Sequence, residues 1–160
     1  MKENAIIRLA NKQDIRELVR MAGMLLQEES ISYDDMLYVD WYQQFGEEHF
    51  IKVLENTNSI CYVAENQDGR AIGYIEAWIS KGRKILPNDR IVITSIFIDN
   101  LHRSKGIGSK LIEETISWAA IKNIDHVEVT AYWANKKVIQ FYKKRKFKIS
   151  TITLSRIIKG

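Results

Sequence analysis

The chain has 160 residues, 46% hydrophobic and 28% charged, which suits one folded core with a polar surface. One proline and eight glycines exclude a collagenous or low-complexity chain, and no apolar run approaches the ~20 residues of a membrane span. The length predicts one domain over residues 1–160. The single cysteine Cys61 and a start without a secretory apolar segment predict a cytoplasmic protein without a membrane partner, whereas the net charge of +4 is too mild to favour one class of partner.

The first half of the chain alternates between strand and helix patterns. Asn11, followed by Asp14, is typical of a helix cap, and the apolar positions after it recur at helical spacing. Gln67, Asp68 and Gly69 form a turn signal between two strand-like runs, which predicts a hairpin. The expected elements are a strand at 5–9, helices at 15–26 and about 36–54, and strands at 59–65, 71–79 and 91–98.

Charge is unevenly distributed along the sequence. Between Glu28 and Glu55 there are eight acidic residues and one lysine, a net charge of −7, which leaves +11 for the rest of the chain. Residues 136–148 contain seven lysines and arginines and no acid. Such a basic stripe is found in nucleic-acid-binding proteins. The charge pattern alone favours a simpler interpretation, a solvated helix with cations near its C-terminus.

The segment 103–109, with the sequence RSKGIGS, separates a buried-looking strand from a helix. The start of a helix presents unpaired N–H groups and the positive end of its dipole, so this junction attracts anions. Gly106 and Gly108 allow positive φ and close backbone approach, Arg103 adds charge, and two serines add hydroxyl donors. The segment suits a pyrophosphate. A tight turn is the alternative, because neither the Walker loop nor the dinucleotide fingerprint is complete here.

The remaining sequence continues the alternation of elements. We expect a strand at 127–131, a helix opened by Asn135, and two closing strands within the alternating, β-branched tail at 148–158. This order of strands and helices implies parallel pairing in the middle of a mixed sheet.

Two motifs in the second half resemble the GNAT superfamily of N-acetyltransferases. Arg103-x-x-Gly106-x-Gly108 is similar to that family's R/Q-x-x-G-x-G/A signature, which lies between its fourth strand and third helix. The stretch 135–147 is similar to the family's N-x-x-A-x-x-F-Y-x-x-x-G-F pattern, with Lys146 in place of the glycine. The resemblance implies an α/β (mixed α+β) fold, a GNAT-like central mixed, splayed sheet of about seven strands flanked by about four helices.

The resemblance also implies acetyl-CoA as co-substrate, held between the fourth and fifth strands. Main-chain groups of residues 96–98 would pair with its pantetheine arm and polarise the thioester carbonyl, while amides of residues 104–109 would hold its pyrophosphate. Tyr142 would protonate the departing thiolate or else be a core aromatic, and Asn135 would contact the cofactor or only cap its helix. The cofactor-binding residues implied in this way are Ile96, Phe97, Ile98, Arg103, Ser104, Lys105, Gly106, Ile107, Gly108, Ser109, Asn135 and Tyr142.

Glu76 is the candidate for the general base that amine acetylation needs. A protonated amine has no lone pair for attack, and the fourth strand lacks the glutamate that many family members use. Glu76 lies between Tyr74 and Trp78 on one face of an apolar strand, where a buried carboxylate needs a reason. A salt bridge or an edge position is the alternative. The expected catalytic residues are therefore Tyr142 and Glu76.

The acidic segment predicts the type of acceptor. The resemblance places the acceptor site along the first two helices, so we expect a cationic amine: a polyamine, an aminoglycoside-like amine or a basic peptide. A solvated acidic helix face is the alternative. His49, His102 and His126 lack metal-ligand spacing, so no metal is expected, and Cys61 is expected to be buried and inert.

These observations favour one function over two others. The expected function is acetyl-CoA-dependent N-acetyl transfer to a small-molecule or peptide amine by direct attack in a ternary complex. The alternatives are a non-catalytic acyl-CoA sensor of the same fold and, less favoured, a nucleic-acid-binding module that uses residues 136–148. The tail at 151–158 would also permit strand pairing across a homodimer.

Overall fold

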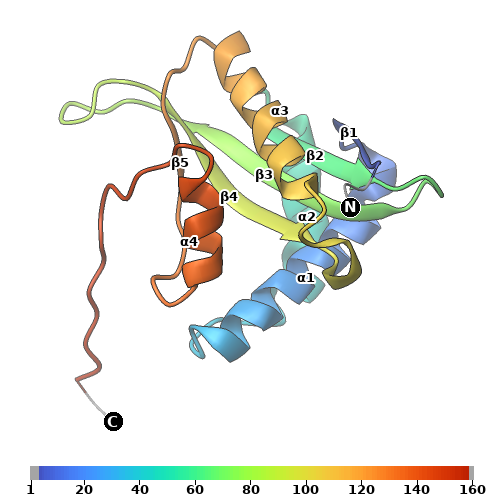
Figure 1. Ribbon diagram of the computed structural model, residues 1–160, viewed down its shortest axis with the longest axis horizontal. Coiled ribbons are helices and arrows are strands. Elements are labelled where there is room, and N and C mark those ends of the chain that lie inside the picture. Colours follow the sequence, from blue (N-terminus) through green and yellow to red (C-terminus); the bar gives the residue numbers. More distant parts are fainter. Residues whose placement is uncertain (1–3, 159–160) are drawn as a thin grey trace. The chain divides into compact units, whose positions relative to one another are not determined.

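A mixed five-stranded sheet, in the order β1-β2-β3-β4-β5, forms the centre of the unit Met1–Thr130 (Figure 1). The computed structural model describes residues 4–158, and the chain divides into this unit and a second one, Ala131–Gly160. The strands are β1 (Ile6–Leu9), β2 (Ser59–Glu65), β3 (Ala71–Ser80), β4 (Arg90–Ile98) and β5 (Val127–Val129). The main helices are α1 (Ile15–Ser32), α2 (Trp41–Glu55) and α3 (Ile107–Ile121) in the first unit and α4 (Lys136–Lys143) in the second; η1 (Lys12–Asp14) and η2 (Asn100–His102) are single 3-10 turns.

Helices cover both faces of the sheet in the first unit. Figure 1 shows α1 and α2 on one face and α3 on the other, so the predicted α/β class is confirmed. On the α1 and α2 face, Leu18 and Phe50 are fully buried and pack in one cluster with Tyr74 of β3. Because side chains alternate along a strand, Glu76 projects from β3 towards the same two helices.

β4 changes its pairing half-way along its length, and this change positions the candidate site. Its first half pairs with β3 on one edge and, over residues 91–93, in parallel with β5 on the other. Beyond residue 93, no strand of the described chain pairs with that second edge. The register to β3 shifts between Glu76 and Ala77, so Thr94 is the extra residue of a β-bulge.

The start of the first helical region agrees with the sequence prediction. The Asn11 side chain accepts a hydrogen bond from the Gln13 N–H at 2.9 Å, and the Asp14 side chain accepts one from the Asn11 N–H at 2.8 Å. The predicted cap is therefore confirmed. Arg8 of β1 also donates two hydrogen bonds to Asp14, at 2.8 and 2.9 Å, which tie the helix start to the sheet.

The sheet has five strands rather than about seven, because the tail forms none. Residues 148–158 alternate as predicted but adopt no strand, and Leu154, Ile157 and Ile158 are exposed. Alternation is a local preference, whereas a strand also needs a partner and neighbours that cover its apolar side chains. The prediction of two closing strands is therefore wrong.

The helices and β5 differ from the prediction mainly in their limits. α2 begins at Trp41 rather than near residue 36, because the Asp34 side chain accepts a hydrogen bond from the Met36 N–H at 3.1 Å, a local turn that competes with helix. β5 ends at Val129, two residues before the predicted limit. Within residues 4–158, no helix has the length and apolar character needed to cross a membrane.

Candidate active site

Glu76 is a buried carboxylate in the middle of β3, and it is only 6% exposed. Its Oε2 lies 2.9 Å from Nε2 of His49 on α2, and its Oε1 accepts a hydrogen bond from Oγ1 of Thr94 at 3.1 Å. Thr94 is the bulge residue of β4, so a carboxylate, an imidazole and the bulge meet at one point. The salt-bridge alternative for Glu76 is thus present, with His49 as its partner.

His49 stands at one end of a row of aromatic side chains on α2. Trp41, Phe45 and His49 are spaced four residues apart and therefore share one face of the helix. Their ring centroids are 5.8 Å apart for Trp41 and Phe45 and 5.6 Å apart for Trp41 and His49. Phe45 is 45% exposed, so the row leads from the surface to the buried carboxylate.

Burial keeps the other ionisable groups near Glu76 neutral. It raises the pKa of Tyr42 to about 12, and the charges of Glu76 and Glu29 add to this effect. Burial likewise raises the pKa of the Tyr74 hydroxyl and of the Cys61 thiol well above their ordinary values. Cys61 is buried as predicted, at 3% exposure. These hydroxyl and thiol groups therefore do not act as bases at neutral pH, whereas a carboxylate with an imidazole can.

The free edge of β4 exposes main-chain groups after the bulge. The Asp99 N–H donates to the Ile72 carbonyl of β3 at 2.9 Å, and hydrogen-bonded positions alternate along an antiparallel strand, so Phe97 directs its amide groups towards β3. The N–H and C=O groups of Ile96 and Ile98 then face the edge that β5 leaves unpaired. The Phe97 side chain lies in the core at 2% exposure.

The loop after β4 enters α3 through two residues with left-handed backbone. Ser104 has φ of 63° and Gly106 of 91°, and no side chain caps the helix that begins at Ile107. Glycine suits position 106 because of this φ, and a β-carbon there would meet open space. Gly108 does not use the positive φ that glycine allows: it is buried inside the first turn of α3, where the backbone is helical. The first-turn N–H groups have no partner within the helix.

The guanidinium group of Arg103 forms hydrogen bonds with two different partners. Its Nε donates to the Ile98 carbonyl at 2.8 Å, and its Nη2 lies 2.9 Å from both carboxylate oxygens of Glu28 on α1. The side chains of this ion pair are 41% and 39% exposed, so the pair remains in contact with solvent. The loop is thereby tied to the acidic end of α1.

Part of the negative charge between Glu28 and Glu55 is compensated by ion pairs. Glu48 pairs with Lys52 at 2.6 Å and Glu55 with Lys12 at 3.1 Å, in addition to the pair between Glu28 and Arg103. Within the described residues, the acids of this segment without an ion pair are Glu29, Asp34, Asp35, Asp40 and Glu47. Of these acids, Asp40 lines a hollow of about 260 Å³, whose wall also contains Arg20.

The second unit contains the two remaining candidates. The Asn135 side chain accepts a hydrogen bond from the Val138 N–H at 3.2 Å, so it caps α4. Tyr142 is 6% exposed, and its ring centroid lies 5.3 Å from that of Phe141 and 5.4 Å from that of Phe147. The cap is one of the two expected roles of Asn135, and the aromatic contacts agree with the core alternative for Tyr142.

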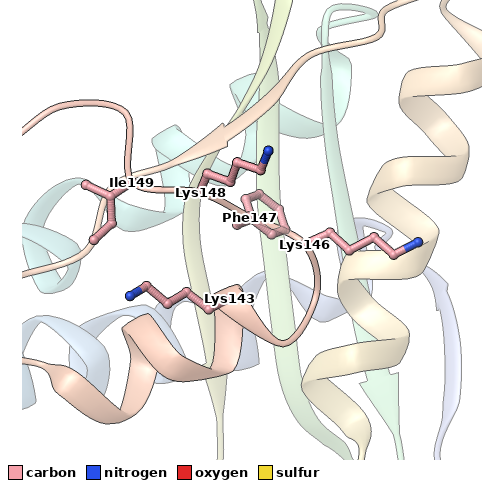
Figure 2. A pocket seen from close by; sticks show the side chains of 5 residues that line it. All are labelled: Lys143, Lys146, Phe147, Lys148 and Ile149. Atoms are coloured by element: carbon pink, nitrogen blue, oxygen red, sulfur yellow. The ribbon is translucent and has the colours of Figure 1, made fainter.

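A hollow of about 540 Å³ in the second unit is lined by three lysines whose ammonium groups do not point to a common position. Its lining residues are Lys143, Lys146, Phe147, Lys148 and Ile149. Figure 2 shows that the three ammonium groups point in different directions. A phosphate site needs donors that converge on one position, so this arrangement does not favour the nucleic-acid alternative.

Comparison with known proteins assigns the family. The family model described as the acetyltransferase (GNAT) family matches residues 25–147, which include both motifs. The chain belongs to this family. Its members are acetyltransferases that use acetyl-CoA.

Three similar proteins illustrate the relationship. An L-2,4-diaminobutyric acid acetyltransferase of Halalkalibacterium halodurans is 30% identical over 95 residues, which are 59% of this chain and 48% of that protein. The chain thus spans about half the length of this relative. A single-site mutant of the BH1408 protein from Bacillus halodurans has a TM-score of 0.88 at 18% identity, covering 96% and 99% of the two chains. A predicted acetyltransferase with acetyl-CoA from Clostridium acetobutylicum has a TM-score of 0.75 at 20% identity, covering 96% of each chain.

Three contacts at the site were not predicted from the sequence: those of His49, Thr94 and Glu28. His49 lies 27 positions from Glu76, although its helical spacing from Trp41 and Phe45 was a signal that could have placed it on the same face. The contact of Thr94 depends on the bulge, for which the sequence of β4 carries no signal.

Proposed function

We propose that the protein transfers the acetyl group of acetyl-CoA directly to a primary amine within a ternary complex. The observation that carries this proposal is the Glu76 carboxylate, buried against the bulge at Thr94, just beyond the residues of β4 that pair with β5. Burying a carboxylate costs free energy unless it is paired; here the partner is an imidazole, and the residues of β4 that follow the bulge have an edge that no strand of the described residues pairs with. A covalent acetyl-enzyme is not supported, because the buried Cys61 thiol has a raised pKa.

The acetyl-CoA site is proposed on the edge of β4 that faces away from β3 and on the start of α3; on this edge the Ile98 carbonyl already accepts a hydrogen bond from Arg103. The outward-facing groups of Ile96 and Ile98 would bind the pantetheine arm and polarise the thioester carbonyl. The N–H groups of residues 104–109, at the uncapped start of α3, would hold the pyrophosphate with Arg103 beside them. Phe97 would contribute by fixing β4 in the core, and Asn135 by ordering α4.

Glu76 is proposed as the basic centre and Tyr142 as the acid. The acceptor must lose a proton before its nitrogen can attack, and Glu76 provides the negative charge that favours this loss. A phenol ordinarily keeps its proton at neutral pH and can give it to the departing thiolate. The role of Tyr142 is supported by its position in the motif at 135–147.

The acceptor is proposed to be a cationic amine: a small polyamine-like or aminoglycoside-like molecule or a basic peptide. The unpaired acids around α1 and α2 support this, because they attract cations, and so does the relative named for diaminobutyric acid, a small diamine. If the attraction operates, the KM of a polycationic acceptor rises with ionic strength; a KM independent of salt would exclude it. We further infer one domain over residues 1–160 and, from the single free cysteine, a cytoplasmic location.

The test is a thiol-release assay with acetyl-CoA and a panel of polyamines, aminoglycosides, amino acids and basic peptides. Thiol release that depends on one class of amine, with the acetylated product seen by mass spectrometry, would support the proposal. Calorimetry on the same sample measures acetyl-CoA binding. Binding without thiol release for any acceptor would indicate the acyl-CoA sensor instead, and absence of binding would overturn both.

A further inference from the structure

The two oxygens of the Glu76 carboxylate each already face one hydrogen-bond partner, and little of the side chain is exposed. Its Oε1 is held by Thr94 Oγ1 at 3.1 Å and its Oε2 by His49 Nε2 at 2.9 Å. Its side chain is 8% exposed, whereas that of His49 is 28% exposed. Of the two groups, the imidazole is therefore the one that an incoming molecule can touch.

The contact with Glu76 also determines how the imidazole is oriented. An ionised carboxylate only accepts hydrogen bonds, so Nε2 of His49 carries the hydrogen in this pair. Nδ1 then has a free lone pair, and within residues 4–158 it has no hydrogen-bond partner. A carboxylate, an imidazole and a free ring nitrogen in series form the arrangement in which a carboxylate orients a basic histidine and stabilises its protonated form.

We propose that His49 is the group that removes the proton from the acceptor amine, and that Glu76 positions it and stabilises the imidazolium. This inference rests on the proposed acetyl transfer and refines the role given there to Glu76. The aromatic row of Trp41 and Phe45 leads from solvent to the same imidazole, and aromatic faces attract alkylammonium groups.

The protons and bonds balance in this scheme. An N–H bond of the ammonium breaks as an N–H bond forms at Nδ1 of His49, and the released lone pair forms the C–N bond to the thioester carbon. The C–S bond then breaks, and the thiolate takes a proton from Tyr142. After the attack the nitrogen is positively charged and loses a second proton, which reprotonates the Tyr142 phenolate. His49 releases the first proton to solvent.

Few other titratable groups surround the pair. Tyr42 on α2, Cys61 on β2 and Tyr74 on β3 remain neutral at neutral pH, because burial raises the pKa of each. Glu29 on α1, through Tyr42, and Asp14, through Cys61, are the remaining carboxylates whose charges reach this cluster. No hydroxyl or thiol group of this cluster therefore competes with the pair for the proton of the acceptor.

The decisive variant is His49→Gln, because the glutamine amide can still donate a hydrogen bond to Glu76 but cannot take up a proton. We expect kcat/KM at neutral pH to fall about 100-fold or more, with unchanged acetyl-CoA affinity and melting temperature. The loss should shrink as the pH approaches the amine's own pKa, about 10.4 for a lysine-like acceptor. Imidazole added to His49→Ala should restore part of the activity. His126→Gln is the matched control, since His126 is 64% exposed beside Glu128, and should retain full activity.

The outcomes separate this inference from the proposed function. An active wild type with a His49→Gln variant within about threefold of it, and with the same pH profile, would overturn the role of His49 and leave acetyl transfer standing. If His49→Gln fails to fold, rescue of His49→Ala by imidazole decides, and absence of rescue in a folded His49→Ala counts against the inference. A wild type that binds acetyl-CoA but acetylates no amine would overturn the proposed function and this inference with it.

Discussion

Two regions of the first unit hold charged side chains, and the regions differ in how much solvent reaches those side chains. At the β4 bulge, Glu76 is 6% exposed and is fixed by His49 and Thr94. In the loop after β4, Arg103 and Glu28 form an ion pair that stays in contact with solvent. Hydrogen bonds to a charge are stronger away from water, whereas an exposed ion pair contributes only about 0–1 kcal/mol. We therefore expect changes at the bulge to affect the chemistry strongly and changes in the loop to affect binding moderately.

The largest effect is expected for Glu76→Gln. Removing the charge should lower kcat/KM by about 10²- to 10⁴-fold at neutral pH, because the acceptor then loses its proton without assistance. The loss should be smaller at high pH, where the amine is already deprotonated. The measurement is a pH profile of thiol release. Glu65→Gln, a carboxylate on the adjacent β2 that pairs with Arg8, is the control; a profile for Glu76→Gln parallel to that of the wild type would remove Glu76 from the mechanism.

Gly106→Ala tests the loop by changing its backbone. The position has φ of 91°, so alanine should cost roughly 1–2 kcal/mol of folding free energy and should weaken acetyl-CoA binding by placing a methyl group at the start of α3. Gly69→Ala separates the two effects, because Gly69 has φ of 76° and equally open space in the turn between β2 and β3. Chemical denaturation and calorimetry should show similar destabilisation of both variants and weaker binding only for Gly106→Ala. Equal affinities would place the pyrophosphate elsewhere.

Arg103→Ala should have a smaller effect on the same binding. Because the guanidinium is 41% exposed and already paired with Glu28, its loss should weaken acetyl-CoA binding by less than about tenfold. That difference should diminish at high ionic strength, where exposed charges are screened. Calorimetry at low and high salt measures it. A loss of affinity of a hundredfold or more would show that Arg103 contributes to binding as strongly as a buried charge does. The expected difference between the loop and the bulge would then be wrong.

The sequence predicts those parts of the fold and site that depend on local patterns. The cap formed by Asn11 and Asp14, the strand 59–65 and the glycine before α3 each follow from residues that are neighbours in the chain. The bulge at Thr94 arises from the register of two strands, and the approach of His49 to Glu76 arises from packing of a helix on a sheet. Neither is encoded in adjacent residues. The tail at 148–158 shows the converse: its alternation is strong, yet a local pattern cannot supply a partner strand.

The smallest effect we expect is on stability, and it concerns Glu29. The exposure of this carboxylate lies between that of the buried Glu76 and that of the solvent-exposed Arg103–Glu28 pair. Glu29 on α1 is partly buried, and within the described residues its side chain has no hydrogen bond or ion pair. Burial, together with the charge of Glu28, raises the pKa of Glu29 above its ordinary value. A raised carboxyl pKa means that the folded state binds the proton more tightly than the unfolded state. The stability from the neutral form is complete below the unfolded pKa and is lost as the pH rises through the folded pKa.

Glu29→Gln should therefore raise the melting temperature at neutral pH by a small amount. The difference from the wild type should disappear well below pH ~4, where the carboxyl is protonated in both states. Glu47→Gln, at an exposed position of α2, is the control and should leave the melting temperature unchanged. If Glu29 also contacts the cationic acceptor, the stabilised variant should show a higher KM for it at low salt. Stabilisation without any change in KM would mean that Glu29 lies outside the acceptor site, and a lower melting temperature would mean that the carboxylate is paired in solution.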